Sequence, residues 1–265
     1  MKTCIFLCCS LLLVQMGFAQ QDSAGNNKLQ FKIGVNYNSS LHYFGRTDSL
    51  SSTGFYPMAE LWLGDSWYVN AAPIFVRNPV VGTEYAGTVA TLGFLKATEH
   101  TVAHLYALKP FYTTESSLVQ SALQGQAGAS VTVLSSLANI TVGGDAKFSD
   151  RIDFGAQASL DHLIRKEAGA SVFIIDPTIT VNAGTQHFLT TYRQKKGFIL
   201  PREEVVTKQK TAFRLLAYEL SVPVIYNRGQ IQLLATPAYV VPQNIQAGEY
   251  GKPLAYISLG AKFTF

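Results

Sequence analysis

Apolar and polar residues alternate with a period of two along most of this sequence, and this alternation restricts the fold more than any other feature. In the segment 28–38, every odd-numbered residue from Leu29 to Tyr37 is apolar, while its even-numbered neighbours are polar or glycine. The C-terminal segment repeats the pattern and places Phe263 and Phe265 on its apolar face. Such alternation predicts β-strands with one apolar and one polar face.

The composition excludes several broad classes of protein. Charged residues make up 14% of the chain, against roughly 25% in an ordinary soluble domain. Hydrophobic residues make up 48%, which excludes a disordered chain. The net charge of +4 is small and scattered, so we expect no nucleic-acid partner. Beyond the N-terminal segment, no apolar stretch is long enough for a transmembrane helix.

Residues 1–19 are predicted to be a cleaved secretory signal. Lys2 provides the positive start, residues 4–14 form the apolar run, and Gly17 and Ala19 provide a small-residue cleavage site. This run is too short to cross a membrane as a helix. All three cysteines lie in the signal, so the mature chain is expected to have no disulfide and no cysteine zinc site. Residues 20–265 are expected to form one domain.

The predicted fold class is all-β, a transmembrane antiparallel up-and-down β-barrel of about twelve strands with short periplasmic turns and longer outer loops. Longer connections are expected at 39–53, 78–85, 114–125, 185–211 and 242–252, while 149–151 is short where the alternation demands a long loop. Any count from ten to fourteen strands satisfies the pattern. The twelve expected strands are 28–38, 54–64, 67–77, 86–96, 101–113, 126–135, 137–148, 152–165, 170–184, 212–227, 230–241 and 256–265.

Alternation alone does not say which face points outward. The polar faces combine charges with small residues, which suits a wet lumen, and apolar aromatic residues such as Trp67 and Phe75 fall at strand ends, as in the girdles of membrane barrels. These features favour lipid on the apolar face. The alternative is a soluble barrel with an apolar core.

Six prolines conflict with a simple closed barrel, because proline cannot donate to the ladder and a closed barrel has no edge strand. We predict bulges where Pro57 and Pro73 face each other across a hairpin; alternatively, some strands are shorter. The six are Pro57, Pro73, Pro110, Pro177, Pro223 and Pro237.

The C-terminal strand ending in Phe263 and Phe265 resembles the recognition signal of Gram-negative outer-membrane β-barrel proteins. The stretches 218–224 and 236–244 look like a hairpin that recurs in uncharacterised barrels of that group, and 176–186 is similar to a further shared segment. The resemblance implies an outer-membrane location and recognition of this strand by the assembly machinery. It implies no activity.

Charged residues on the polar faces are the candidate lumen lining. They could set the ion or solute preference of a channel, or they could pair and fill a narrow barrel. Both readings stay open, because a twelve-stranded lumen lies between filled and open barrels. The candidates are Lys32, Glu60, Asp145, Lys147, Asp153, Asp161, Arg165, Asp176, Glu219 and Lys262.

The connection 185–211 is predicted to be a basic outer loop. Its charge suits contact with anionic lipopolysaccharide, outer-membrane lipids or an anionic solute, although loop charges also serve solvation alone. Its cations are Arg193, Lys195, Lys196, Arg202, Lys208 and Lys210.

The standard catalytic motifs are absent from the sequence, including the His-x-Ser-Asn pattern of barrel phospholipases. The five histidines show no metal-ligand spacing. We therefore expect no enzyme activity, no metal and no cofactor. The leading hypothesis is passive passage of small polar solutes or ions. The alternatives are a closed structural or interaction barrel that acts through its outer loops and, third, an outer-membrane lipid-modifying enzyme.

Overall fold

The computed structural model describes residues 29–47, 51–80, 82–113, 123–196, 202–245 and 250–265, with the backbone alone for 187–210. The predicted signal peptide lies outside the described residues. In the described part of the chain, no helix is long and apolar enough to cross a membrane.

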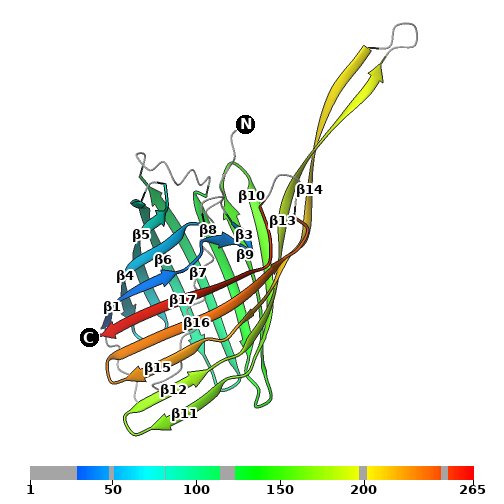
Figure 1. The fold of residues 1–265 in the computed structure, drawn as a ribbon. Coiled ribbons are helices and arrows are strands. Elements are labelled where there is room, and N and C mark those ends of the chain that lie inside the picture. Colours follow the sequence, from blue (N-terminus) through cyan, green and yellow to red (C-terminus); the bar gives the residue numbers. More distant parts are fainter. Residues whose placement is uncertain (1–28, 48–50, 81, 114–122, 197–201, 246–249) are drawn as a thin grey trace.

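The chain forms a closed antiparallel β-barrel of twelve strands, three of which are each divided into two elements (Figure 1). A two-residue hairpin, β2 (His42–Tyr43) with β3 (Arg46–Thr47), lies in the first outer loop. The wall consists of β1 (Leu29–Asn38), β4 (Thr53–Leu63), β5 (Trp67–Asn78), β6 (Gly82–Ala97), β7 (Thr101–Tyr112), β8 (Gly125–Val133), β9 (Asn139–Phe148), β10 (Ile152–Asp161) with β11 (Ile164–Ala168), β12 (Ser171–Ile175) with β13 (Thr178–Lys196), β14 (Arg202–Ser221) with β15 (Val224–Arg228), β16 (Ile231–Pro242) and β17 (Leu254–Thr264).

The barrel closes because the first strand pairs with the last. β1 and β17 pair from Lys32↔Thr264 to Asn38↔Ser258, and each other barrel strand pairs with its neighbours in the chain. This confirms the predicted fold class and the count of twelve strands. Closure leaves no edge strand within the wall.

Each division of a strand falls at a proline of that strand or of its neighbour, and the register does not change across it. Asp161↔Thr178 of β10–β13 and Ile164↔Ile175 of β11–β12 lie on one register, so the ladder resumes unchanged after the break. The proline carbonyls still accept hydrogen bonds from the neighbouring strand. These bonds run from His162 N to Pro177 O (3.3 Å), from Asp176 N to Pro223 O (3.0 Å) and from Val222 N to Pro237 O (3.0 Å).

Pro57 and Pro73 lie opposite each other, as predicted, but they cause no bulge. The β4–β5 ladder stops after Phe55↔Phe75 and resumes at Ala59↔Ala71 in the same register. Two facing prolines remove both donors of a hydrogen-bonded pair, which explains the gap. The predicted bulge is therefore absent from the β4–β5 ladder, although a register shift follows directly after Pro73 on the other side of β5.

Two register shifts occur in the described ladders. One falls between Ile74 and Phe75 on the β6 side of β5, where Ala86 is the extra residue. The other falls between Asn182 and Ala183, where Leu216 of β14 is extra. The first shift begins one residue after Pro73, and the second lies between two strands that contain no proline.

Two connections differ from the prediction. The segment 78–85 is not a long loop, because β6 begins at Gly82 and Asn78 pairs with it. The segment 185–211 is largely strand: β13 and β14 stay paired as far as Lys196↔Arg202 and project from one end of the barrel as a ribbon (Figure 1). Outside the membrane, neither face of a strand must be apolar, so the alternation that reveals the other strands is missing here.

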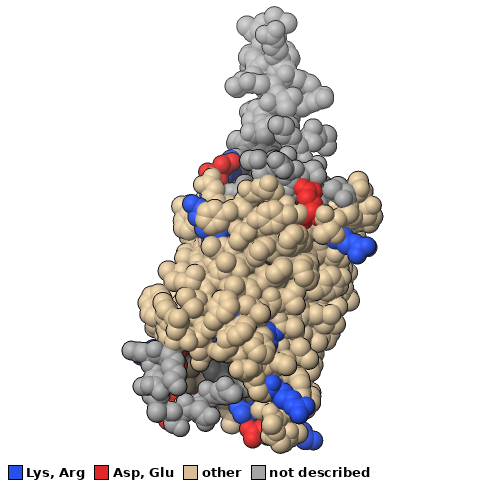
Figure 2. All heavy atoms as spheres, turned by 90° about the vertical axis from the view of Figure 1, so that its left-hand side faces the viewer, with Lys and Arg blue, Asp and Glu red and all other residues tan. Residues whose placement is uncertain are grey.

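The barrel exposes apolar residues on its outer surface and encloses charged ones, which is the opposite of a soluble protein. Outward-facing Val142 is 60% exposed, whereas inward-facing Glu60 is 2% exposed. The middle of the visible face carries almost no charged side chain, and the charges gather towards the two ends (Figure 2). The apolar faces therefore point outward, as predicted, and the alternative of a soluble barrel with an apolar core is excluded.

The orientation of β9 predicts a strong difference between neighbouring substitutions. Val142→Arg places a charge in lipid and is expected to lower the free energy of unfolding by about 2 kcal/mol or more. Thr141→Arg, on the inward face, is the matched control and is expected to cost much less. Urea titration of both variants refolded into lipid vesicles measures the difference. Equal losses would contradict the assigned orientation.

Candidate functional site: the barrel lumen

A tryptophan and two tyrosines form an aromatic row on the lumen side of the wall, at directly paired positions of neighbouring strands. Trp62 of β4 pairs with Tyr68 of β5, Tyr68 with Gly93, Gly93 with Tyr106 of β7, and Tyr106 with Gly128 of β8. A Cβ atom on Gly93 would lie 2.2 Å from Tyr68 Cζ, and one on Gly128 would lie 2.6 Å from Tyr106 Cζ. The rings therefore lie flat across neighbouring strands, and only glycine leaves room for them.

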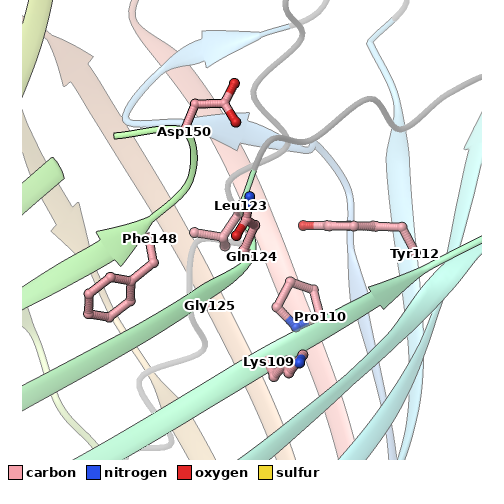
Figure 3. A pocket seen from close by; sticks show the side chains of 8 residues that line it. All are labelled: Lys109, Pro110, Tyr112, Leu123, Gln124, Gly125, Phe148 and Asp150. Atoms are coloured by element: carbon pink, nitrogen blue, oxygen red, sulfur yellow. The ribbon is translucent and has the colours of Figure 1, made fainter. Parts of the chain in front are cut away.

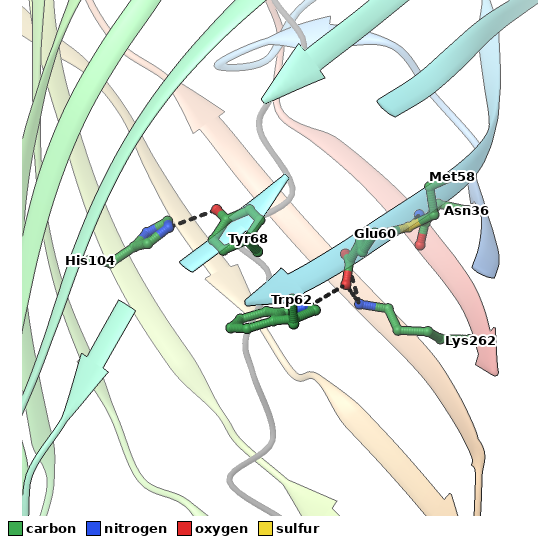
Figure 4. A network of polar contacts seen from close by, with 7 residues as sticks. All are labelled: Asn36, Met58, Glu60, Trp62, Tyr68, His104 and Lys262. Carbon is green, nitrogen blue, oxygen red and sulfur yellow. Dashed lines mark hydrogen bonds and ion pairs between the residues drawn. The ribbon is translucent and has the colours of Figure 1, made fainter. Parts of the chain in front are cut away.

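A buried ion pair begins this packed side of the lumen (Figure 4). Lys262 Nζ donates to Glu60 Oε1 at 3.1 Å and to Oε2 at 3.2 Å, and Trp62 Nε1 donates to Glu60 Oε2 at 3.2 Å. Lys32 Nζ lies 4.6 Å from the centre of the Trp62 ring. The buried carboxylate thus has three compensating bonds, which a buried charge requires.

The network continues through the aromatic row. The Trp62 and Tyr68 rings stack with centroids 4.9 Å apart, and Tyr68 Oη shares a 2.9 Å hydrogen bond with His104 Nε2 (Figure 4). The His104 and Tyr106 rings stack at 5.5 Å, and Gln126 Nε2 donates to Tyr106 Oη at 3.0 Å. Side chains from β17 to β8 therefore form one connected layer on this side of the lumen.

The opposite side is more accessible. Every inward-facing residue of β9 and β10 is half-buried and none is buried, although these residues are enclosed by the barrel. We call this surface the open wall. It contains Asn139, Thr141, Gly143, Asp145, Lys147, Asp153, Gly155, Gln157, Ser159 and Asp161.

Polar contacts hold the side chains of the open wall against the strands. Lys147 forms an ion pair with Asp145 on its own strand. Asn139 Nδ2 donates to Asp161 Oδ2 at 2.7 Å. The side chains of the open wall are small, or they bind one another along the strands, so they leave space in the lumen beside this wall.

Most candidate lumen residues fall into these two groups. Lys32, Glu60 and Lys262 meet on the packed side, while Asp145, Lys147, Asp153 and Asp161 lie on the open wall. Each of these seven side chains comes from the inward face of its strand.

The remaining three candidates lie elsewhere. Asp176 is buried and its carboxyl group interacts with that of Asp161. Glu219 accepts a 3.0 Å hydrogen bond from Tyr256 Oη. Arg165 lies on β11 near the periplasmic end, where its side chain is 39% exposed and pairs with Glu167 at 2.8 Å.

The candidate basic residues lie on the projecting ribbon and not in a loop. Their backbones belong to β13 and β14, and their side chains lie outside the described part of the structure. They are Arg193, Lys195, Lys196, Arg202, Lys208 and Lys210.

The predicted assembly residues lie at the seam that closes the barrel. Phe265 N donates to Phe31 O at 2.9 Å, and the Phe265 ring contacts those of Phe31 and Phe263 with centroids 5.6 and 4.9 Å away. The terminal strand is thus held by β1 in the folded barrel. Its recognition by the assembly machinery stays a prediction.

The first outer loop is a feature that the sequence did not reveal. Arg46 donates to Leu216 O at 3.2 Å and to Gln243 O at 2.7 Å. Leu216 is the extra residue of the β13–β14 register shift, so one of these bonds goes to the carbonyl of the bulge. The His42 ring packs edge-on against Tyr256 with centroids 4.4 Å apart, and its Nδ1 accepts from Gly45 N at 3.2 Å. The loop is therefore tied to the outer ends of β14, β16 and β17.

Comparison with known proteins assigns no family. No family model matches the chain, and no curated protein sequence is significantly similar to it. Three solved barrels are similar in structure. LpxR from Salmonella typhimurium is 12% identical, with 89% of this chain and 100% of that chain covered and a TM-score of 0.43. The translocator domain of the autotransporter NalP from Neisseria meningitidis is 10% identical, with 92% and 90% covered and a TM-score of 0.40. The outer membrane channel DcaP of Acinetobacter baumannii is 9% identical, with 90% and 96% covered and a TM-score of 0.28.

Similarity at this level carries no inference about activity. The description of the molecule as a transmembrane β-barrel rests on its closed strand order and its inverted surface, both described above.

The aromatic row predicts the effect of filling one glycine. Gly93→Ala forces Tyr68 from its position and is expected to lower the free energy of unfolding by about 1–3 kcal/mol. Gly125→Ala is the matched control, because the nearest atom to its Cβ would be 3.4 Å away. The urea concentration at the midpoint of unfolding, measured in detergent, compares the stability of the two variants. The cost of Gly93→Ala should vanish in a Tyr68→Ala background, and a cost that persists there would contradict this explanation.

The first outer loop predicts a pH dependence. Burial lowers the pKa of His42 from 6.5 to about 4. Because the unfolded loop binds the proton more readily, the stability gained from packing His42 is complete above pH 6.5 and is lost as the pH falls towards 4. The full loss corresponds to about 3 kcal/mol. Hydrogen exchange at Gly45 N, relative to amides of β9, should accelerate over this range. A His42→Gln variant should lose the pH dependence; if it kept the dependence, another group would be responsible.

Proposed function

We propose that the protein is a passive channel of the Gram-negative outer membrane for small polar solutes and ions, with a preference for cations. The observation that carries this proposal is the open wall, because its residues are accessible although they face the inside of a closed barrel. The proposed mechanism selects by size and charge and includes no covalent step.

The open wall extends over the full length of the two strands that form it. It runs from the Asp153↔Lys147 pair at the outer end to the Asp161↔Asn139 pair at the periplasmic end. A polar, accessible strip of this length supports a continuous path for water and small solutes. The aromatic row supports it too, because rings that lie flat over Gly93 and Gly128 take little of the cross-section.

The charges of the open wall favour cations. It carries three aspartates and one lysine, and the lysine is paired with Asp145. Asp161 receives a hydrogen bond from a neutral amide, which leaves its negative charge uncompensated by that contact. Fixed charges of one sign along a narrow path raise the local concentration of the opposite ion.

The projecting ribbon favours a second candidate function, an interaction barrel. β13 loses β10 as a partner beyond Gly184, and β14 loses β16 beyond Ala217, so in the described part of the chain no third strand pairs with the ribbon. Exposed strand edges can accept an added strand from a partner. The six basic residues of the ribbon make lipopolysaccharide headgroups a second proposed contact.

Single-channel recording in a planar lipid bilayer tests the channel. Residues 20–265, refolded and inserted, should give reproducible ohmic steps, and a salt gradient should give a reversal potential of the sign expected for cation selectivity. Replacing Asp153 and Asp161 together by asparagine should lower the cation-to-anion permeability ratio by roughly twofold or more.

Glu167→Gln is the matched control, because this carboxylate lies on β11 outside the open wall and is well exposed. It should leave selectivity unchanged. A folded barrel that never conducts would overturn the channel proposal and leave the interaction barrel as the better account. Conductance with anion selectivity would overturn the assigned role of the aspartates.

A further inference from the structure

Residues 39–47 of the first outer loop, which include β2 and β3, contact strands on both sides of β1, and we call this segment the strap. On one side, the Leu41 side chain packs against a buried apolar cluster on the inward faces of β4, β5 and β6. The cluster consists of Tyr56, Ile74, Val76 and Ala86. Tyr112 packs against the same cluster and also lines a cavity of about 730 Å³ at the base of the β7–β8 connection (Figure 3).

On the other side of β1, the strap is attached to β17, β16 and β14. The His42 ring packs against Tyr256, which lies on the inward face of β17. Gly45 lies so close to Pro242, at the end of β16, that a Cβ atom on Gly45 would be 2.8 Å from the proline Cδ. Arg46 donates at 3.2 Å to a main-chain carbonyl of β14.

These contacts place the strap inside the ring of strands. In the strand order of the closed barrel, β4 and β14 are separated by β1, β17 and β16. A segment that contacts the inward sides of this arc lies over the enclosed space, and β3 lies within the outline of the wall in Figure 1. Because β9 and β10 lie outside the arc, the strap covers the entrance from the side away from the open wall.

The turn of the strap is held by its contacts and not by local preference. Phe44 and Gly45 connect β2 to β3 with φ angles of 51° and 78°. A positive φ suits glycine, but a bulky residue such as phenylalanine rarely adopts it. A strained backbone of this kind persists only where its surroundings fix it, and such residues are concentrated in segments that switch. Loss of one contact therefore favours a different conformation of the strap.

Neutral His42 supplies one of these contacts. Its Nδ1 accepts a 3.2 Å hydrogen bond from Gly45 N, so the proton of the neutral ring is on Nε2. Nε2 is buried and has no hydrogen-bond partner among the described residues. A second proton would have to bind Nδ1, where it would face the Gly45 N–H group and break the bond across the turn. Burial accordingly lowers the pKa of His42 to about 4.

The groups around His42 provide little compensation for a positive charge. Tyr256 lies against the ring from β17, and its hydroxyl donates to Glu219 Oε1 of β14 at 3.0 Å. This carboxylate is therefore already engaged. The titratable residues of the strap itself and of the last outer loop, which is bridged to it, are Tyr43, Arg46, Tyr250 and Lys252. A charged His42 is consequently better solvated by water outside the entrance.

We propose that the strap is an acid-released gate of the outer entrance: with neutral His42 it narrows the entrance, and protonation of His42 detaches it and admits larger solutes. This inference rests on the proposed channel, whose entrance it regulates. The released strap binds a proton more readily than the packed strap. The ratio of packed to released strap should therefore fall by on the order of a hundredfold as the pH falls from 6.5 towards 4.

The distance between two nitroxide labels tests the release without any need for conductance. The sequence has cysteines at positions 4, 8 and 9 alone, so residues 20–265 accept introduced labels. Thr47→Cys labels the strap, and Ser136→Cys labels an exposed periplasmic turn. Double electron–electron resonance should give one narrow distance distribution at pH 7.5 and a broad, shifted one at pH 4. The control pair Ser136→Cys and Asp150→Cys, both in turns of the wall, should give the same distance at both pH values.

Substitutions identify the group that takes up the proton. H42Q should keep the narrow distribution at both pH values, and H42F, which keeps a ring against Tyr256, replaces it if H42Q does not hold the strap at pH 7.5. H100Q, at an exposed histidine of a periplasmic turn, is the matched control and should respond like the parent protein. E219Q should also respond like the parent.

Swelling of vesicles in neutral sugars of increasing size tests the gate. Uptake of the larger sugars should rise several-fold from pH 7.5 to pH 4, while uptake of the smallest should change little. R46C and G251C lie at paired positions of an isolated bridge between the strap and the last outer loop. A disulfide between them should abolish the rise, and its reduction should restore it.

The outcomes separate the gate from the channel. A distance distribution that does not change at pH 4, or that changes equally without His42, would overturn the release. Release of the strap with an unchanged size limit would overturn its role as a gate. Vesicles that do not swell at either pH, although the labels move, would overturn the channel and leave the acid release of the strap supported.

Discussion

Backbone hydrogen bonding in an apolar surrounding is the constraint on which the rest of this structure depends. Lipid cannot satisfy an unpaired N–H or C=O group, so strands that cross it must pair on both sides. The β1–β17 ladder meets this demand by closing the sheet. Closure then separates the two faces of every strand. One contacts lipid and is apolar, and the other is enclosed and collects the charges that are rare elsewhere on the wall.

The prolines show how the chain meets this constraint where donors are missing. At Pro57 and Pro73 the ladder skips one stretch and resumes in register, and at Pro177 the carbonyl still accepts from the next strand. The β7–β8 ladder ends two residues before Pro110, at Leu108↔Gln126, because β8 itself begins at Gly125. The loss of a donor is therefore accommodated within the paired wall, without a change of register at these sites.

The sequence predicts those parts of the fold that the membrane itself dictates. Lipid requires an apolar residue at every second position, so the strands can be read from alternation, and the alternating short and long connections indicate a barrel of about twelve strands. The outward face needs further evidence, which the charges of the polar faces and the aromatic residues at strand ends supply. The ribbon beyond Gly184 lies outside that requirement, and its strands were mistaken for a loop. The lumen contacts were also out of reach, because they depend on register between distant strands. Lys262 meets Glu60 across β1, and nothing local in either segment indicates this pairing.

The lumen is packed on one side and accessible on the other, so it combines the two arrangements expected for a barrel of twelve strands. On one side, Glu60, Trp62 and Tyr68 pack into a connected layer, and the glycines opposite the rings keep this layer thin. On the other side, β9 and β10 present small and charged residues that nothing covers completely. A network that fills the barrel and a path that crosses it are therefore not exclusive alternatives. The packed side supplies rigidity, and the open wall keeps its charged side chains accessible, as the proposed channel requires.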